Sequence, residues 1–301
     1  MSEYMPSDGS EYHFWFDSLE EFASKSDELV KNGPNSGRWL EVLTSYRYNE
    51  VERNGVGSQR EAMRKCIDGW PELLPILHEK VAILKQQVDL GEVEAVSVSM
   101  RRRKRTRNDY GDSLDITRVW SGQLDKAWER PVRRQVMTAT QRYATIFVDL
   151  AMFFDNTFEQ SLWRAALAYC LVEVLTGMGI NTEIWCGSSH VGQFMSPSYP
   201  RKSWRAVRIK EYTQPLTDER LAAMVSAGFH RTWGWKMICA QPMRVNDGFG
   251  MPMHNGLVKP LRDRKEAGER VFRIGGCMSL AGAIIDLNAA LETLKNHKEA
   301  A

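Results

Sequence analysis

The most concentrated source of chemistry in this 301-residue chain is a basic run near its middle. Six of the seven residues in 101–107 are Lys or Arg, and residues 101–134 hold eleven basic against five acidic residues. Cations spaced in this way can follow phosphates with salt-dependent, largely sequence-independent affinity, and nearby aromatic rings can stack on unpaired bases. The predicted nucleic-acid-binding residues are Arg101, Arg102, Arg103, Lys104, Arg105, Arg107, Tyr110 and Trp120.

Two other interpretations of the basic run stay open. The formal net charge of the whole chain is only +2, so the remainder is slightly acidic and the charge is unevenly distributed. A basic surface of this kind also fits an acidic protein partner, and a solvated hairpin tip without a partner has the same composition. The sequence does not decide among these three.

The reactive side chains of the sequence do not form a recognisable catalytic motif. The six histidines form no H-E-x-x-H pair, and the chain lacks the phosphate-binding G-x-x-x-x-G-K-[ST] and hydrolase G-x-S-x-G motifs. Cys186 and His190 lie four residues apart after a predicted strand, but a nucleophile and its base must converge in space with an orienting group. We therefore expect Cys186 to be a core residue, and we expect no enzyme, no cofactor and no metal.

A carboxylate is predicted at the end of the clearest strand. Residues 144–150 form an apolar run that contains Asp149, as in a parallel strand buried on both faces. Residues 159–178 then carry apolar side chains at helical spacing, and residues 181–186 have the pattern of a second buried strand. A strand, a helix and a strand form a right-handed βαβ unit. Open α/β sheets bind ligands at the carboxyl ends of their strands, which is where Asp149 is expected.

This unit resembles the opening of a von Willebrand A domain. The similarity lies in residues 143–149, the helix that follows, and residues 179–185. In that family the first strand ends in D-x-S-x-S, whose hydroxyls help to hold Mg²⁺. Here only Asp149 remains, because Leu-Ala-Met-Phe follows it, and Asp155 and Thr157 are the nearby residues that could contribute oxygens. Mg²⁺ requires near-octahedral oxygen ligation, so the resemblance implies a degenerate site.

Shorter blocks are similar to bacteriophage-type proteins of unknown function that have degenerate A-like domains. These blocks are residues 204–211, 215–221 and 228–231. The resemblance implies a protein that binds another macromolecule, and an AAA+ ring ATPase is the partner it suggests. The first functional prediction is therefore a non-catalytic adaptor of viral type. The alternative is a protein that binds single-stranded DNA or RNA through residues 101–134, and an enzyme ranks third.

The remaining composition is typical of a protein that is neither secreted nor inserted into a membrane. Hydrophobic residues make up 43% of it, no stretch approaches the roughly 20 apolar residues of a membrane span, and the polar N-terminus lacks the apolar region of a signal peptide. Five scattered cysteines without a C-x-x-C pair are expected to be buried free thiols. We therefore expect a cytoplasmic location, in the host cytoplasm if the protein is viral, and no membrane partner.

Changes of pattern divide the chain into three parts. Residues 1–92 are predicted to form a mostly helical N-terminal region, residues 93–142 a basic strand-turn segment, and residues 143–301 an A-like α/β domain with a Rossmann-like central sheet flanked by helices. The packing of the N-terminal region, the oligomeric state and the partner's identity stay open. Further strands are expected at residues 204–210, 235–240 and 271–274, and helices at residues 217–226 and 280–296.

Overall fold

A computed structural model gives the fold of the protein. Parts of the predicted helical N-terminal region, such as residues 38–54, and the first four basic residues, 101–104, lie outside the residues that it describes. The described residues are 2–4, 11–33, 36–37, 55–88, 105–108, 113–114, 116–123, 127–131, 143–152, 156–191, 202–215, 217–240, 251–252, 256–275 and 277–299.

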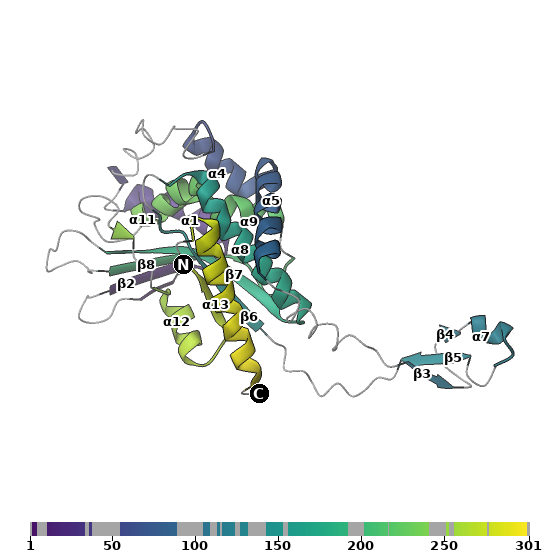
Figure 1. Cartoon of the computed structure of the whole chain (residues 1–301). Coiled ribbons are helices and arrows are strands. Elements are labelled where there is room, and N and C mark those ends of the chain that lie inside the picture. The colour runs from purple at the N-terminus through teal and green to yellow at the C-terminus, as the bar shows by residue number, and fades with distance from the viewer. Residues whose placement is uncertain are drawn as a thin grey trace.

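Six strands lie side by side in one mixed sheet, and a seventh, β9, pairs with the end of β7 (Figure 1). In sheet order the strands are β1 (Ser2–Tyr4), β2 (Glu11–Phe16), β8 (Lys202–Lys210), β7 (Asn181–Val191), β6 (Tyr143–Asp149) and β10 (Val271–Ile274), with β9 at Met251–Pro252. β6, β7 and β10 are parallel to one another, whereas β8 is antiparallel to β7 and parallel to β2. The predicted α/β class is therefore confirmed.

The predicted strand–helix–strand unit forms the centre of this sheet. β6 and β7 are adjacent and parallel, and helix α8 (Phe158–Gly177) connects them. Thr157 begins the helix: its Oγ1 accepts the N–H of Gln160, and the Gln160 side chain accepts the N–H of Thr157. Gly179, at φ +73°, makes the turn that leads into β7. The sequence predicted this unit from its apolar spacing, and the structure adds the cap at Thr157, which had been considered only as a possible oxygen ligand.

Helices cover both faces of the main sheet. The larger apolar core lies on the face that carries α8, where Ile146 and Val148 of β6 are fully buried. On the opposite face, α12 (Lys259–Glu266) buries Leu261 with Phe147 and Trp185. The helices that contribute to the larger core include α1 (Leu19–Asn32), α4 (Gln59–Asp68), α5 (Leu74–Gln87) after the 3₁₀ turn η2 (Pro71–Leu73), α9 (Asp218–Val225) and α13 (Leu280–Glu299).

The N-terminal region adds two strands and a helix to this same sheet and core. β2 pairs in parallel with β8, and its Phe14 and Phe16 are fully buried. Ser18 caps α1 by accepting a backbone N–H three residues further on. Phe22 of α1 then packs on Phe16, with ring centroids 4.9 Å apart. The question that the sequence left open is thus answered, because the N-terminal residues pack on the α/β sheet.

The strand predicted at residues 235–240 is wrong, because these residues belong to a helix. Trp233 and Met237 are buried in the main core, while Trp235 and Cys239 belong to a separate buried cluster. A helix that is buried on two sides gives a continuous apolar run, the same pattern that a buried strand gives. The helix is formed by three consecutive pieces, α10 (Ala227–Phe229), the π-helical turn η4 (His230–Gly234) and α11 (Trp235–Cys239).

A small antiparallel sheet, here called the basic sheet, contains part of the basic segment. Its strands pair in the order β3-β5-β4, and helix α7 follows β4 in the chain. In Figure 1 the basic sheet and α7 lie apart from the main sheet and its helices. The elements are β3 (Arg105–Asn108), β4 (Ser113–Leu114), α7 (Ile116–Trp120) and β5 (Trp128–Pro131).

Candidate functional site

The basic sheet and the adjoining helix α7 hold three of the predicted nucleic-acid-binding residues. Arg105 and Arg107 lie on β3, paired with β5, and Trp120 is the last residue of α7. The Trp120 side chain is 86% exposed, which is unusual for an indole. Residues 101–104 and Tyr110 lie outside the described residues. The structure therefore brings an exposed indole and two arginines of the basic run into one small unit.

Asp149 ends β6 at the carboxyl edge of the main sheet, and it is only 1% exposed. Its Oδ1 accepts the N–H of Ala151 at 2.9 Å, and its Oδ2 accepts a hydrogen bond from Nη2 of Arg273 at 2.6 Å. Burial raises the pKa of the Asp149 carboxyl, while Arg273, the Ala151 N–H and the charge of Arg164 act in the opposite direction. The carboxylate is thus engaged by groups of the protein itself.

These residues do not fit the Mg²⁺ ion that the resemblance to A-type domains implies. Both oxygens of Asp149 already have partners, and Arg273 places a positive charge where a cation would bind. The hydroxyl of Thr157 serves as the cap of α8, and Asp155 lies outside the described residues. Leu150 and Ala151 have no side-chain oxygen. The donor set at this edge therefore favours an ion pair over an octahedral metal site.

Four arginines and a histidine gather around this edge, and none of them was among the site residues predicted from the sequence. The strand register places Arg205 of β8 opposite Ser188 of β7, directly after the pairing of Asp149 with Gly187. The side chains of Arg164 and Arg205 are almost completely buried, at 0% and 2% exposure. We call the group the arginine cluster, and its members are Arg164, Arg205, His230, Arg231 and Arg273.

The π-helical turn η4 brings His230 and Arg231 to the cluster. Such turns are rare and occur frequently at functional sites. Nη2 of Arg231 donates to the carbonyl of Asn156, just before α8, at 2.6 Å. The N–H of Ala227 donates to Oγ of Ser161 at 2.8 Å, which holds this helix against α8. Arg164 follows Ser161 by three residues and so lies on the same face of α8.

The electrostatics of the cluster are those of a buried positive region. Burial lowers the pKa of His230 well below its ordinary value, and the neighbouring Arg164, Arg231 and Arg205 lower it further. The imidazole is therefore neutral at neutral pH. Burial also lowers the pKa of Arg205 to about 9, so this side chain keeps its charge at pH 7. One sequence signal was available: Arg164 interrupts an otherwise apolar stretch of α8.

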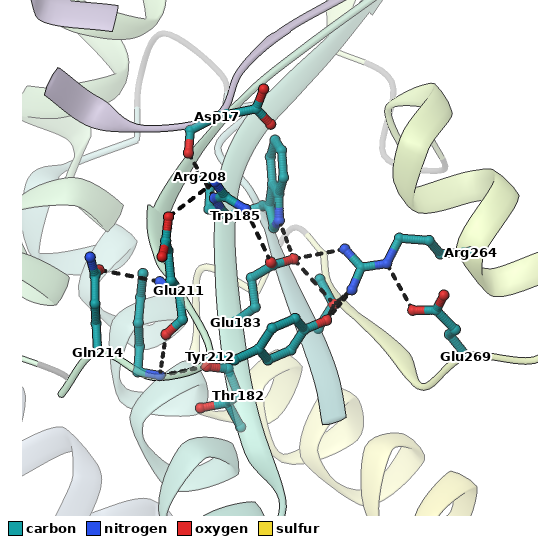
Figure 2. A network of polar contacts seen from close by, with 12 residues as sticks. Asp17, Thr182, Glu183, Trp185, Arg208, Glu211, Tyr212, Gln214, Arg264 and Glu269 are labelled. Atoms are coloured by element: carbon teal, nitrogen blue, oxygen red, sulfur yellow. Dashed lines mark hydrogen bonds and ion pairs between the residues drawn. The ribbon is translucent and has the colours of Figure 1, made fainter. Parts of the chain in front are cut away.

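A second polar network, at the opposite end of β6 and β7, shows balanced charges (Figure 2). Glu183 is 2% exposed and accepts hydrogen bonds from Nη1 of Arg264 at 2.8 Å and from the indole N–H of Trp185 at 2.5 Å. Arg264 also pairs with Glu269 at 2.8 Å. Three cations are matched by three carboxylates, namely Arg208, Lys210 and Arg264 with Glu183, Glu211 and Glu269. This network has the composition of a structural ion-pair network.

The thiols have the properties of core residues. All five cysteines are free and buried, as the sequence predicted. Burial raises the pKa of Cys186 strongly, and it raises the pKa of Cys170 and of Cys277 to about 12. A thiol held in its protonated form is a poor nucleophile. The pairing of Cys186 with His190 considered above therefore gains no support.

The comparisons with known proteins give a family for the chain. No curated protein and no solved structure matches it. Within the described residues, no helix has both the length and the apolar character needed to cross a membrane. The family model described as "Domain of unknown function (DUF7192)" matches residues 6–278, a range that includes strands of both the main and the basic sheet. The chain therefore belongs to the DUF7192 family.

Proposed function

We propose that this protein is a non-catalytic, macromolecule-binding adaptor built on a degenerate von Willebrand A-like domain. The observation that supports this most directly is the ion pair of Asp149 with Arg273, because Asp149 is the one residue left of the A-type metal motif. The parallel pair β6 and β7, joined by α8, agrees with the resemblance of this segment to an A domain. Binding by such a domain depends on protein surface and not on bound Mg²⁺.

A magnesium titration of the melting temperature tests this proposal. We expect the melting temperature of the full chain to be the same in millimolar Mg²⁺ and in a potassium salt of equal ionic strength. Asp149→Asn, which removes the charge that a metal would need, should respond in the same way. A Mg²⁺-dependent rise that disappears in Asp149→Asn would instead assign a working metal site to this edge.

The proposed partner is another protein, and the resemblance makes an AAA+ ring ATPase the first candidate. The proposed location is the cytoplasm, that of the host if the protein belongs to a bacteriophage. An apolar contact survives high salt, whereas contacts between exposed charges weaken as screening increases. We therefore expect the full chain to remain bound to a purified cognate ATPase at about 0.5 M salt, where the Debye length is well under 10 Å. Absence of binding at low salt would refute this partner.

The second candidate function is binding of single-stranded nucleic acid by the basic sheet. The observation that favours it is the 86% exposure of Trp120 in the same small unit as Arg105 and Arg107. Exposed aromatic rings beside cations provide the two contacts that single strands use, stacking on bases and pairing with phosphates. This combination would also explain why the basic charge is concentrated in one segment.

Fluorescent single- and double-stranded DNA and RNA, titrated across a salt series, test this second function. Replacing the six basic residues of 101–107 by glutamine should abolish binding and its steep salt dependence. Trp120→Ala should weaken binding at least about fivefold, since stacking on one base contributes about 1–3 kcal/mol. Ile285→Ala removes a comparably exposed apolar side chain, 68% exposed on α13, and should leave binding unchanged. If the intact chain does not bind at low salt, the nucleic-acid function is refuted.

A further inference from the structure

The arginine cluster contains buried hydrogen-bond donors that no described residue satisfies. Each of three arginines is held through Nη2: Arg164 donates to the carbonyl of Ala151, Arg205 to Oγ of Ser203, and Arg273 to Asp149. In the described part of the chain, Nε and Nη1 of Arg164, Nε and Nη1 of Arg205, and Nε of Arg273 have no partner. Buried donors are nearly always paired, and an unpaired one destabilises the folded state.

The cluster also carries a surplus of positive charge. Asp149 and Asp286 act on Arg164, and Asp149 also pairs with Arg273, whereas no carboxylate of the described residues acts on the buried Arg205. Asp286 lies close enough to Arg164 to affect its pKa, and it accepts the N–H of Gly275 at 3.2 Å. A buried charge without a counter-charge is strongly unfavourable. The network around Glu183, shown in Figure 2, has no such surplus.

We propose that the arginine cluster binds a phosphate-type oxyanion. A phosphate group brings the negative charge that Arg205 lacks among the described residues, and its oxygens accept several N–H donors at once. The place agrees with this ligand, because open α/β sheets bind ligands beyond the carboxyl ends of their parallel strands. Inorganic phosphate and the terminal phosphate of a nucleotide or nucleic-acid strand share this chemistry. This site is separate from the basic sheet and does not depend on the function proposed above.

Thermal unfolding of the full chain in phosphate, compared with chloride at equal ionic strength, tests the site. We expect phosphate to raise the melting temperature by about 3 °C at ten times its dissociation constant. Arg205→Met should abolish this rise and leave the melting temperature in chloride unchanged or higher, since the variant removes an unpaired buried charge. Arg208→Gln is the matched control: it removes an arginine three residues along the same strand, from the balanced network, and should retain the full phosphate response.

Three results would overturn the proposal: no specific effect of phosphate on the wild type, an undiminished effect on Arg205→Met, or loss of the effect in Arg208→Gln. If Arg205→Met does not fold, Arg205→Lys keeps the charge without the planar fork. Its phosphate affinity should be about tenfold weaker, since a hydrogen bond to a charged group contributes about 1.5–3 kcal/mol. Equal affinity of Arg205→Lys and the wild type would contradict the site.

A second arm distinguishes the two sources of the phosphate group. Calorimetric titration compares one oligonucleotide with a 5′-phosphate and the same oligonucleotide with a 5′-hydroxyl. Tighter binding of the phosphorylated strand by the wild type, lost in Arg205→Met, assigns the site to a strand end. A phosphate response in the melting experiment, without any preference between the strands, assigns it to the free ion. Absence of the phosphate response in the melting experiment removes the site, whatever the basic sheet binds.

Discussion

Asp149→Asn is expected to lower the free energy of unfolding by about 3 kcal/mol. Breaking a buried ion pair by removing one partner costs about 3–5 kcal/mol, because the other charge stays buried. Asp149 is 1% exposed and lies 2.6 Å from Arg273, so solvent screens the pair little. The amide oxygen of asparagine can still accept the N–H of Ala151, which places the loss at the lower end of that range. The surplus positive charge of the arginine cluster rises by one at the same time.

Urea unfolding followed by tryptophan fluorescence measures this loss, in a chloride buffer so that no oxyanion compensates. The midpoint should fall while the slope of the free energy against urea stays constant, which is the signature of a change in stability alone. The control is Glu269→Gln, since Glu269 also pairs with an arginine at 2.8 Å but is 51% exposed. Its loss should be at most about 1 kcal/mol. If Asp149→Asn costs no more than this control, the ion pair does not hold the carboxyl edge together.

Three further predictions concern the elements that build this edge. Thr157→Ala should cost about 1 kcal/mol in urea unfolding, because it removes the N-terminal cap of α8, and Thr157→Ser should restore the stability. Gly187→Ala should cost about 3 kcal/mol or more, since the added Cβ would lie 2.2 Å from the carbonyl oxygen of Arg205; a loss below 1 kcal/mol would contradict this close approach. The pKa of His230 is lower in the folded than in the unfolded state, so the unfolded state binds the proton first as the pH falls below about 6.5. Stability should therefore decrease from pH 7 to pH 5, by up to about 1.4 kcal/mol per pH unit from this residue, and His230→Gln should decrease less steeply. Parallel pH profiles of the two proteins would refute the burial of a neutral imidazole.

The parts of the fold that the sequence predicted are those encoded by local signals. The apolar run that contains Asp149 and the helical spacing of apolar residues in 159–178 predicted β6 and α8, and both patterns are local in the chain. The strand at Trp235 was mispredicted because burial on two sides hides the helical period. The parallel pairing of β2 with β8 joins segments far apart in the chain, so no local pattern could reveal it.

The candidate site was less predictable than the fold for the same reason. The arginine cluster takes its members from α8, β8, η4 and β10, which only the folded chain brings together. In the sequence, Arg205 is one residue of a predicted strand, and Arg231 lies in a short block, residues 228–231, to which no chemistry was assigned. Arg164 alone gave a signal, as a cation within an apolar helix. The basic run was obvious from composition, whereas the buried cluster depends on burial and pairing, which composition does not record.

Two conclusions concern the carboxyl edge: its residues do not fit Mg²⁺, and its arginine cluster is proposed to bind an oxyanion. Both follow from the positive charge of this region. A metal site at the end of β6 needs an excess of oxygen ligands, whereas Arg273 neutralises Asp149 and the remaining arginines make the region positive. The arginines that make this edge unsuitable for a cation are therefore the same residues that favour an anion. It follows that Mg²⁺ and phosphate should have different effects on the melting temperature of one protein, with phosphate raising it and Mg²⁺ leaving it unchanged. If Mg²⁺ raised the melting temperature and phosphate did not, the edge would bind a cation and not an anion, and both conclusions would be refuted.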